Sequence, residues 1–195
     1  MGRILDHDYI VPLLWMRDKG FFPVFVCGNV NETNETLSEW RKSTKPSAGR
    51  RIQVMLKIAK AIQYLHSMGV IFQYIIGDIF LDSDFRAKLH FRGTTLRYIR
   101  ETPSSHHMLG SDDKILYSNQ TNIFIFGYLF YEMYFDRDMN LRDRLEFKRD
   151  IIAEKPSEPE ISEDAWQLIQ RCCAEDPRSR PSINEIVQEM ESWKI

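Results

Sequence analysis

The chain has 195 residues, 43% hydrophobic and 28% charged, which predicts one folded domain, or a large piece of one, with a sizeable core and argues against disorder. Its 26 Lys and Arg residues nearly balance 28 Asp and Glu residues, so the net charge of −2 predicts binding to neither nucleic acid nor an anionic membrane. Three cysteines without a C-x-x-C spacing, and no N-terminal signal pattern, predict a soluble cytoplasmic protein without a disulfide framework.

The first predicted element is a β-hairpin within residues 8–30, where two apolar stretches flank a charged turn ending at Gly20. Residues 37–42 predict a short helix, which the Pro- and Gly-containing segment after it ends. Residues 51–68 predict an amphipathic helix, because apolar side chains recur at three- and four-residue steps. Its polar face includes Arg51, and Gly69 is placed to form a left-handed C-terminal cap.

Short strands are predicted at residues 70–72, 79–81 and 87–91, followed by a long loop over 94–114. Residues 122–135 are apolar almost all round, which is typical of a helix buried on every side, with Phe126 and Phe130 in the core. Two further helices are predicted near the C-terminus. Ser162 is the N-cap of one, and Ser182 with Glu185 forms a capping box at the start of the other.

Several strings occur in the order typical of one large family. CCAEDPRSRPS ends at Ser182 and is similar to the family pattern C-W-x-x-D-P-x-x-R-P-S. NIFIFGYLFYEM begins at Asn122 and is similar to D-V-Y-S-F-G-x-x-L-W-E-M. With residues 58–69 and 79–89, these strings resemble the C-terminal lobe of eukaryotic protein kinases, nearest the tyrosine-kinase-like group. The resemblance implies a protein kinase-like α+β fold. Residues 31–195 would form a mainly α-helical C-lobe, and residues 1–30 a small β-hairpin remnant of the N-lobe.

The parts that hold ATP phosphates in this family have no counterpart in the sequence. A kinase has a Gly-rich loop over the phosphates and a strand Lys before this lobe. The nine glycines are too widely spaced to form such a loop. We therefore expect either a fragment or a truncated gene product.

The resemblance places the family's H-R-D motif on Phe72, Gln73 and Tyr74. The motif's Asp is the catalytic base, whereas a Tyr with an ordinary pKa of about 10 is protonated near pH 7 and cannot replace a carboxylate. Gln73 has no charge with which to bind an activation-loop phosphate. No catalytic residue is therefore predicted.

The magnesium-binding positions also differ from the family pattern. Asp78 replaces the metal-binding Asn and is a candidate metal ligand, although a lone loop carboxylate is more often solvated. The D-F-G motif falls on Phe91, Arg92 and Gly93. Phe91 offers no oxygen, and Arg92 places positive charge where the cation would lie. We therefore expect no cofactor, and ATP with magnesium only if the chain is a kinase after all.

Three further positions are expected to be structural. Asn122 stands in the place of the central helix's Asp, and Glu132 and Arg180 match the family. The A-P-E motif falls on residues 109–111, so Arg180 lacks its Glu partner, which Asp112 or Asp113 could replace. Two residue pairs are weak candidates for a functional site. His106 and His107 could bind a transition metal but lack a third ligand, and Cys172 with Cys173 is interpreted as core packing rather than redox chemistry.

The altered motifs predict a catalytically inactive pseudokinase that acts as a protein-interaction or scaffold module. One alternative is an active or residually active ATP-dependent kinase with Ser/Thr or Tyr specificity. Another is a truncated product without a selected function. We expect a protein partner or self-association through residues 8–30, because a lone hairpin would leave its apolar face uncovered. These apolar residues are Ile10, Val11, Leu13, Leu14, Phe22, Val24 and Phe25.

Overall fold

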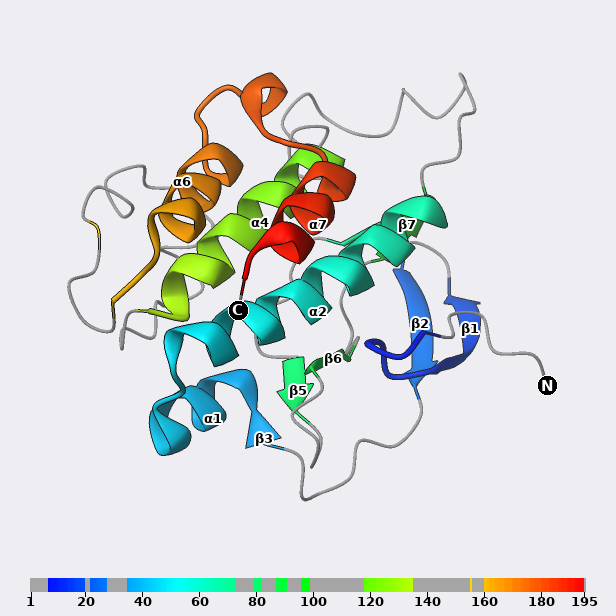
Figure 1. The fold of residues 1–195 in the computed structure, drawn as a ribbon. Helices are drawn as coiled ribbons and strands as arrows, with labels where there is room; N and C mark the ends of the chain where they lie inside the picture. The colour runs from blue at the N-terminus through cyan, green and yellow to red at the C-terminus, as the bar shows by residue number, and fades with distance from the viewer. Residues whose placement is uncertain are drawn as a thin grey trace.

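The computed structural model describes residues 7–19, 22–27, 35–72, 79–81, 87–90, 96–98, 118–134, 155 and 160–194. In these parts of the chain the helices are α1 (Leu37–Thr44), α2 (Ala48–Ser67), α4 (Asn119–Glu132), α6 (Glu163–Cys172) and α7 (Ile183–Ser192). Figure 1 shows α4 between α6 on one side and α7 with α2 on the other. The chain is therefore a helical body with small sheets at its edge.

The buried central helix is confirmed. From Thr121 to Glu132 every residue of α4 except Phe124 is buried, and Phe126 and Phe130 are fully inaccessible. The helix begins at Asn119, three residues earlier than predicted, because the Ser118 hydroxyl accepts a hydrogen bond from the Thr121 backbone N–H at 3.1 Å. An apolar pattern locates the buried part of a helix, whereas its first turn depends on the polar cap.

The long amphipathic helix is also confirmed, as α2. It begins at Ala48 because Ser47 caps it, and Gly69 follows its last turn at φ +67°. One assignment within it is wrong, since Arg51 is 6% exposed rather than on the solvent face. Its guanidinium donates to the carbonyl oxygens of Pro46 and Met133, and these bonds compensate for its burial.

Caps determine the boundaries of the other helices. The predicted caps are present: Ser162 accepts from the Ala165 N–H, and Ser182 with Glu185 forms a capping box. A capping box that the sequence reasoning missed, Thr36 with Glu39, begins α1. Its signal is the ordinary T-x-x-E spacing.

The strands form three small antiparallel sheets. β1 (Leu13–Lys19) pairs with β2 (Phe22–Cys27), which confirms the predicted hairpin. β3 (Glu35–Thr36), β5 (Ile79–Leu81) and β6 (Ala87–Leu89) form the second sheet. β4 (Val70–Phe72) pairs with β7 (Leu96–Tyr98) in the third. β7 lies where the sequence predicts only a loop, because the available edge of β4, rather than local propensity, makes it a strand.

The segment before the hairpin pairs with β6 and is buried at Ile10 and Val11. The Val11 N–H donates to the Leu89 carbonyl at 2.8 Å, and the Leu89 N–H donates to the Tyr9 carbonyl at 2.9 Å. Ile10 and Val11 are 1% and 4% exposed, and Ile10 is part of the main core. The expectation that these two residues lie on an uncovered apolar face is therefore wrong. Leu13, Leu14, Phe22, Val24 and Phe25 lie in β1 and β2, whose side chains are outside the described part.

Candidate functional site

The end of β4 is fixed by one buried amide side chain from α4. Asn122 is fully inaccessible, and its Oδ1 accepts a hydrogen bond from the Phe72 backbone N–H at 3.3 Å. Its Nδ2 donates to the Phe72 carbonyl at 2.5 Å. A carboxylate could accept the first bond but could not donate the second. Asn122 therefore binds both backbone groups of Phe72, the residue from which the family's catalytic motif would continue.

A histidine completes this anchor. His66, in the last turn of α2, places its Nε2 at 3.1 Å from Asn122 Oδ1. Because the two Phe72 bonds fix the Asn122 amide with its oxygen toward His66, Nε2 must carry the proton and donate. Burial lowers the pKa of His66, and the hydrogen bond to Asn122 only partly opposes this effect. The imidazole is therefore neutral near pH 7.

Arg180 connects the segment before α7 to the start of α4. Its Nε donates to the Ala174 carbonyl and its Nη1 to the Gln120 carbonyl, both at 2.9 Å. The guanidinium also lies 5.0 Å from the centre of the Phe124 ring. Backbone carbonyls and an aromatic face thus hold Arg180, while Asp112 and Asp113, the acids suggested as its partners, lie outside the described residues.

Glu132 lies in a buried charged region at the C-terminal end of α4. Arg41 from α1 donates to the carbonyl oxygen of Glu132, and Arg51 from α2 donates to that of Met133. All three charged side chains are at most 6% exposed. The two guanidiniums bind carbonyls that a helix end leaves without intrahelical partners, at the negative pole of its dipole. The sequence reasoning identified Glu132 but missed both arginines.

The cysteine pair packs against α4. A Cβ atom added to Gly127 would lie 2.5 Å from Cys172 Cβ and 2.8 Å from Cys173 Sγ, so only glycine allows this approach. Burial raises the pKa of Cys172 and raises that of Cys173 to about 12. A thiol with a raised pKa forms little thiolate, which supports the interpretation of core packing over redox chemistry.

The other candidate residues lie outside the part of the chain that the structure describes. These residues are Gln73, Tyr74, Asp78, Phe91, Arg92, Gly93, His106 and His107. Within the described residues, no three His, Cys, Asp or Glu side chains converge as they would in a metal site. The same residues include no helix long and apolar enough to cross a lipid bilayer.

Comparison with known families agrees with this architecture. The model of the family described as protein tyrosine and serine/threonine kinase matches residues 3–190. The chain belongs to this family. The mainly helical body with its small sheets is accordingly a kinase-like domain.

Individual relatives of this kinase-family chain are distant. It is 28% identical over 158 residues to the human dual serine/threonine and tyrosine protein kinase, covering 72% of the chain and 16% of the relative. It is 25% identical over 161 residues to the honeybee protein of the same name, covering 73% of the chain and 16% of the relative. The pufferfish Tetraodon nigroviridis has another such protein, with 26% identity over 76% of the chain and 18% of the relative. The chain thus spans less than a fifth of these relatives.

Proposed function

We propose that this kinase-family chain does not transfer phosphate and acts through protein contacts, as a scaffold or interaction module. The proposal is supported by one contrast. The anchor at Phe72 holds the end of β4 through Asn122 and His66, at the place where the family's catalytic loop begins. Two residues further along, the sequence has Tyr74 in place of the catalytic carboxylate. A domain that acts through protein contacts needs its fold but not its catalytic base. It is therefore expected to keep the hydrogen bonds at Phe72 and to tolerate the loss of the base at Tyr74.

The chemistry of the altered positions supports the same proposal. Phosphoryl transfer depends on positioning and on neutralising charge, which magnesium and a carboxylate base supply. Phe91 offers no oxygen ligand, and Arg92 adds positive charge beside it. Loss of several such groups together leaves little transition-state stabilisation.

A second candidate function is phosphoryl transfer itself. The family assignment favours it, since each of the three relatives described above is named as a dual serine/threonine and tyrosine kinase. Phosphoryl transfer would require other groups to supply the base that is missing at Tyr74 and the metal ligand that is missing at Phe91. The scaffold function requires neither.

Labelled phosphate separates the two functions. Purified chain is incubated with magnesium, labelled ATP and a generic acceptor protein, in parallel with Tyr74→Phe as a matched control. We expect both proteins to give only background label. Incorporation by the unaltered chain above the Tyr74→Phe level would refute the proposal.

Nucleotide binding provides an independent measurement. A ligand present at 100 times its Kd stabilises a folded protein by about 2.7 kcal/mol, which raises the melting temperature measurably. We expect no saturable shift with magnesium and ATP below millimolar concentration. A clear shift would contradict the expected absence of a nucleotide site.

We also propose that residues 8–30 contribute a contact surface, for a protein partner or for a second copy. β1 and β2 pair only with each other among the described strands, which supports an available sheet edge. Since Ile10 and Val11 are buried and pair with β6, the proposed surface narrows to the two strands themselves.

A further inference from the structure

Positive charge is concentrated in one continuous part of the chain. Residues 40–77 contain seven of the 26 Lys and Arg residues and none of the 28 Asp and Glu residues. This leaves 19 basic against 28 acidic residues elsewhere, a formal charge of −9. The small net charge of the whole chain therefore conceals an uneven distribution of charge along the sequence.

Part of this charge is used inside the fold. Arg41 and Arg51 are buried and donate to the carbonyls at the end of α4. Lys60 forms an ion pair with Glu191 of α7 at 2.6 Å. These three cations hold helices together and are not presented to a partner.

Of the remaining four cations, Lys57 lies in the middle of α2, and the other three lie at the turn between α1 and α2. Lys42 and Lys45 are exposed, and Arg50 is half-buried and donates from Nη1 to Gln53 Oε1 at 3.3 Å. Lys42 and Arg50 also make other contacts within the chain. Lys45 makes no ion pair with any described residue. The first turn of α2 contains no acidic side chain, so the positive end of the helix dipole adds to the same field. Two acids lie near the turn: Glu35 Oε1 accepts a hydrogen bond from the Ser43 hydroxyl at 2.9 Å, and the Glu39 carboxylate caps α1.

The backbone of this turn is held in one conformation. Lys45 has the left-handed φ of +47°, and its N–H donates to the Arg41 carbonyl at 3.3 Å. The buried Pro46 gives its carbonyl to Arg51 Nε at 2.8 Å, and Ser47 caps α2. A turn fixed in this way loses little conformational entropy when it binds a partner.

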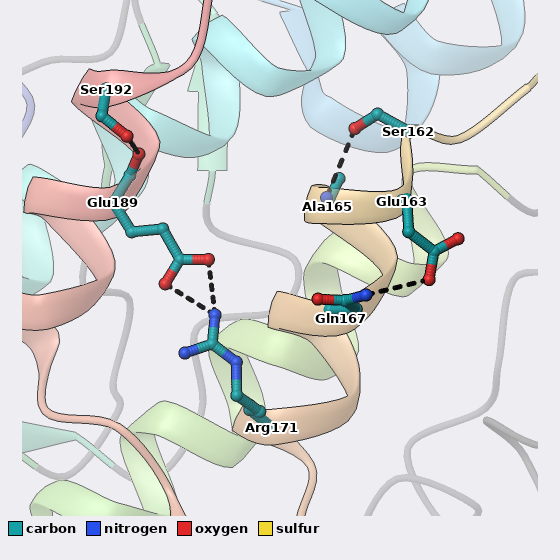
Figure 2. Close-up of polar contacts among 7 residues, drawn as sticks. All are labelled: Ser162, Glu163, Ala165, Gln167, Arg171, Glu189 and Ser192. Carbon is teal, nitrogen blue, oxygen red and sulfur yellow. Dashed lines mark hydrogen bonds and ion pairs between the residues drawn. The ribbon is translucent and has the colours of Figure 1, made fainter.

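An acidic boundary lies beside the basic turn. A cavity of about 850 Å³ separates Gly49 and Ile52 of α2 from Asp164 of α6, Glu189 of α7 and the exposed Lys194 after α7. Figure 2 shows Glu189 beside Arg171 of α6. Arg171 Nη2 donates to the two Glu189 carboxylate oxygens at 2.5 and 2.6 Å, so Asp164 and Lys194 are the other charged residues along the cavity. The described residues 160–191 carry eight acidic and three basic side chains. The positive charge of the turn therefore adjoins a part of the chain with net negative charge.

We propose that the turn between α1 and α2, through Lys42, Lys45 and Arg50, docks a short acidic segment of a partner protein. This inference rests on the proposed function as an interaction module and names the chemistry of the partner. A bilayer or a nucleic-acid duplex is broad enough to meet the acidic side chains of α6 as well, whereas a short peptide avoids them. The described exposed residues of the turn also include no aromatic side chain on which a base could stack.

A labelled peptide tests the proposal directly. Fluorescein-labelled octaglutamate is titrated with the full chain without nucleotide, at about 50 mM and about 200 mM sodium chloride, and anisotropy is recorded. Octaglutamine is the uncharged control. We expect octaglutamate alone to bind, more weakly at the higher salt concentration. Lys45→Glu should weaken binding about fivefold, and Lys45→Gln should weaken it less.

A charge reversal elsewhere on the surface distinguishes binding at the turn from an effect of the net charge of the chain. Arg178 is exposed on the short helix η3 (Pro177–Ser179), and Arg178→Glu changes the net charge as Lys45→Glu does. We expect Arg178→Glu to bind like the unaltered chain, with circular dichroism showing that every variant is folded. Equal losses in both variants, or no binding of octaglutamate, would overturn the proposal.

Two further probes test the class of partner. Phosphatidylserine-containing vesicles or a DNA duplex that bind more tightly than octaglutamate, and lose affinity in Lys45→Glu, would also overturn it. Because no nucleotide is present, a kinase activity found in the phosphate assay would refute the proposed function and leave this docking site standing. If only peptide binding fails, the docking site is refuted and the proposed function is left standing.

Discussion

Replacement of Gly127 by alanine tests whether contact between α4 and α6 determines the stability of the helical body. The new Cβ would lie 2.5 Å from Cys172 Cβ and 2.8 Å from Cys173 Sγ. Carbon atoms in favourable contact are about 3.5–4.0 Å apart, so the two helices must separate by about 1 Å. Cys172 Cβ is attached directly to the backbone of α6, so side-chain rotation cannot relieve this contact.

Two opposing effects determine the magnitude. Alanine in place of glycine within a helix stabilises it by about 1 kcal/mol. Overpacking of a well-packed core costs about 1–3 kcal/mol, and the short distances here place this site at the upper end. We expect a net loss of about 2 kcal/mol in the free energy of unfolding. For a chain of this size, that corresponds to a melting temperature about 4–8 °C lower.

Urea unfolding followed by circular dichroism and tryptophan emission measures this loss. Trp166 of α6 lies with its ring centre 6.3 Å from that of Tyr131 of α4, so its emission reports on the separation of the helices. Gly69→Ala is the matched control, since nothing lies within 4 Å of its added Cβ and only the φ of +67° costs about 1 kcal/mol. A Gly127→Ala variant as stable as the unaltered chain would show that helix propensity outweighs packing here and would refute the reasoning.

Three other outcomes follow from the structure. Phe126→Ala and Phe130→Ala should each cost about 3–5 kcal/mol in urea unfolding, because both rings are fully buried, and a change within error would mean that α4 is not central. Burial lowers the pKa of His66 below 6.5, so the unfolded chain binds that proton more tightly and stability should fall as pH decreases from about 7 toward the folded pKa. His66→Gln, which can still donate to Asn122, should reduce this slope, and an unchanged slope would count against His66 as its source. Replacing β1 and β2 by a flexible linker should abolish self-association in light scattering, whereas an unaltered chain that is monomeric at high concentration would contradict self-association through these strands.

Much of the architecture is encoded locally. The spacing of apolar residues predicted α2 and α4, because α2 buries one face and α4 is buried on nearly every side. Hydroxyl caps such as Ser162 and the Ser182–Glu185 pair fixed helix starts, because they satisfy N–H groups within a few residues. The family motifs likewise gave the structural position of Asn122 without coordinates.

The remaining features depend on partners that are distant in the sequence. Arg51 follows a solvent-facing pattern but is buried, because the carbonyl of Met133, 82 residues away, accepts its hydrogen bond. β7 is a strand because β4 offers it an edge, and Ile10 is core because Leu89 pairs with its neighbours. Sequence pattern thus determined the elements with local patterns and caps. Tertiary structure decided the pairing of charges and strand edges, since a buried polar group is stable only where its hydrogen-bond partner is brought to it.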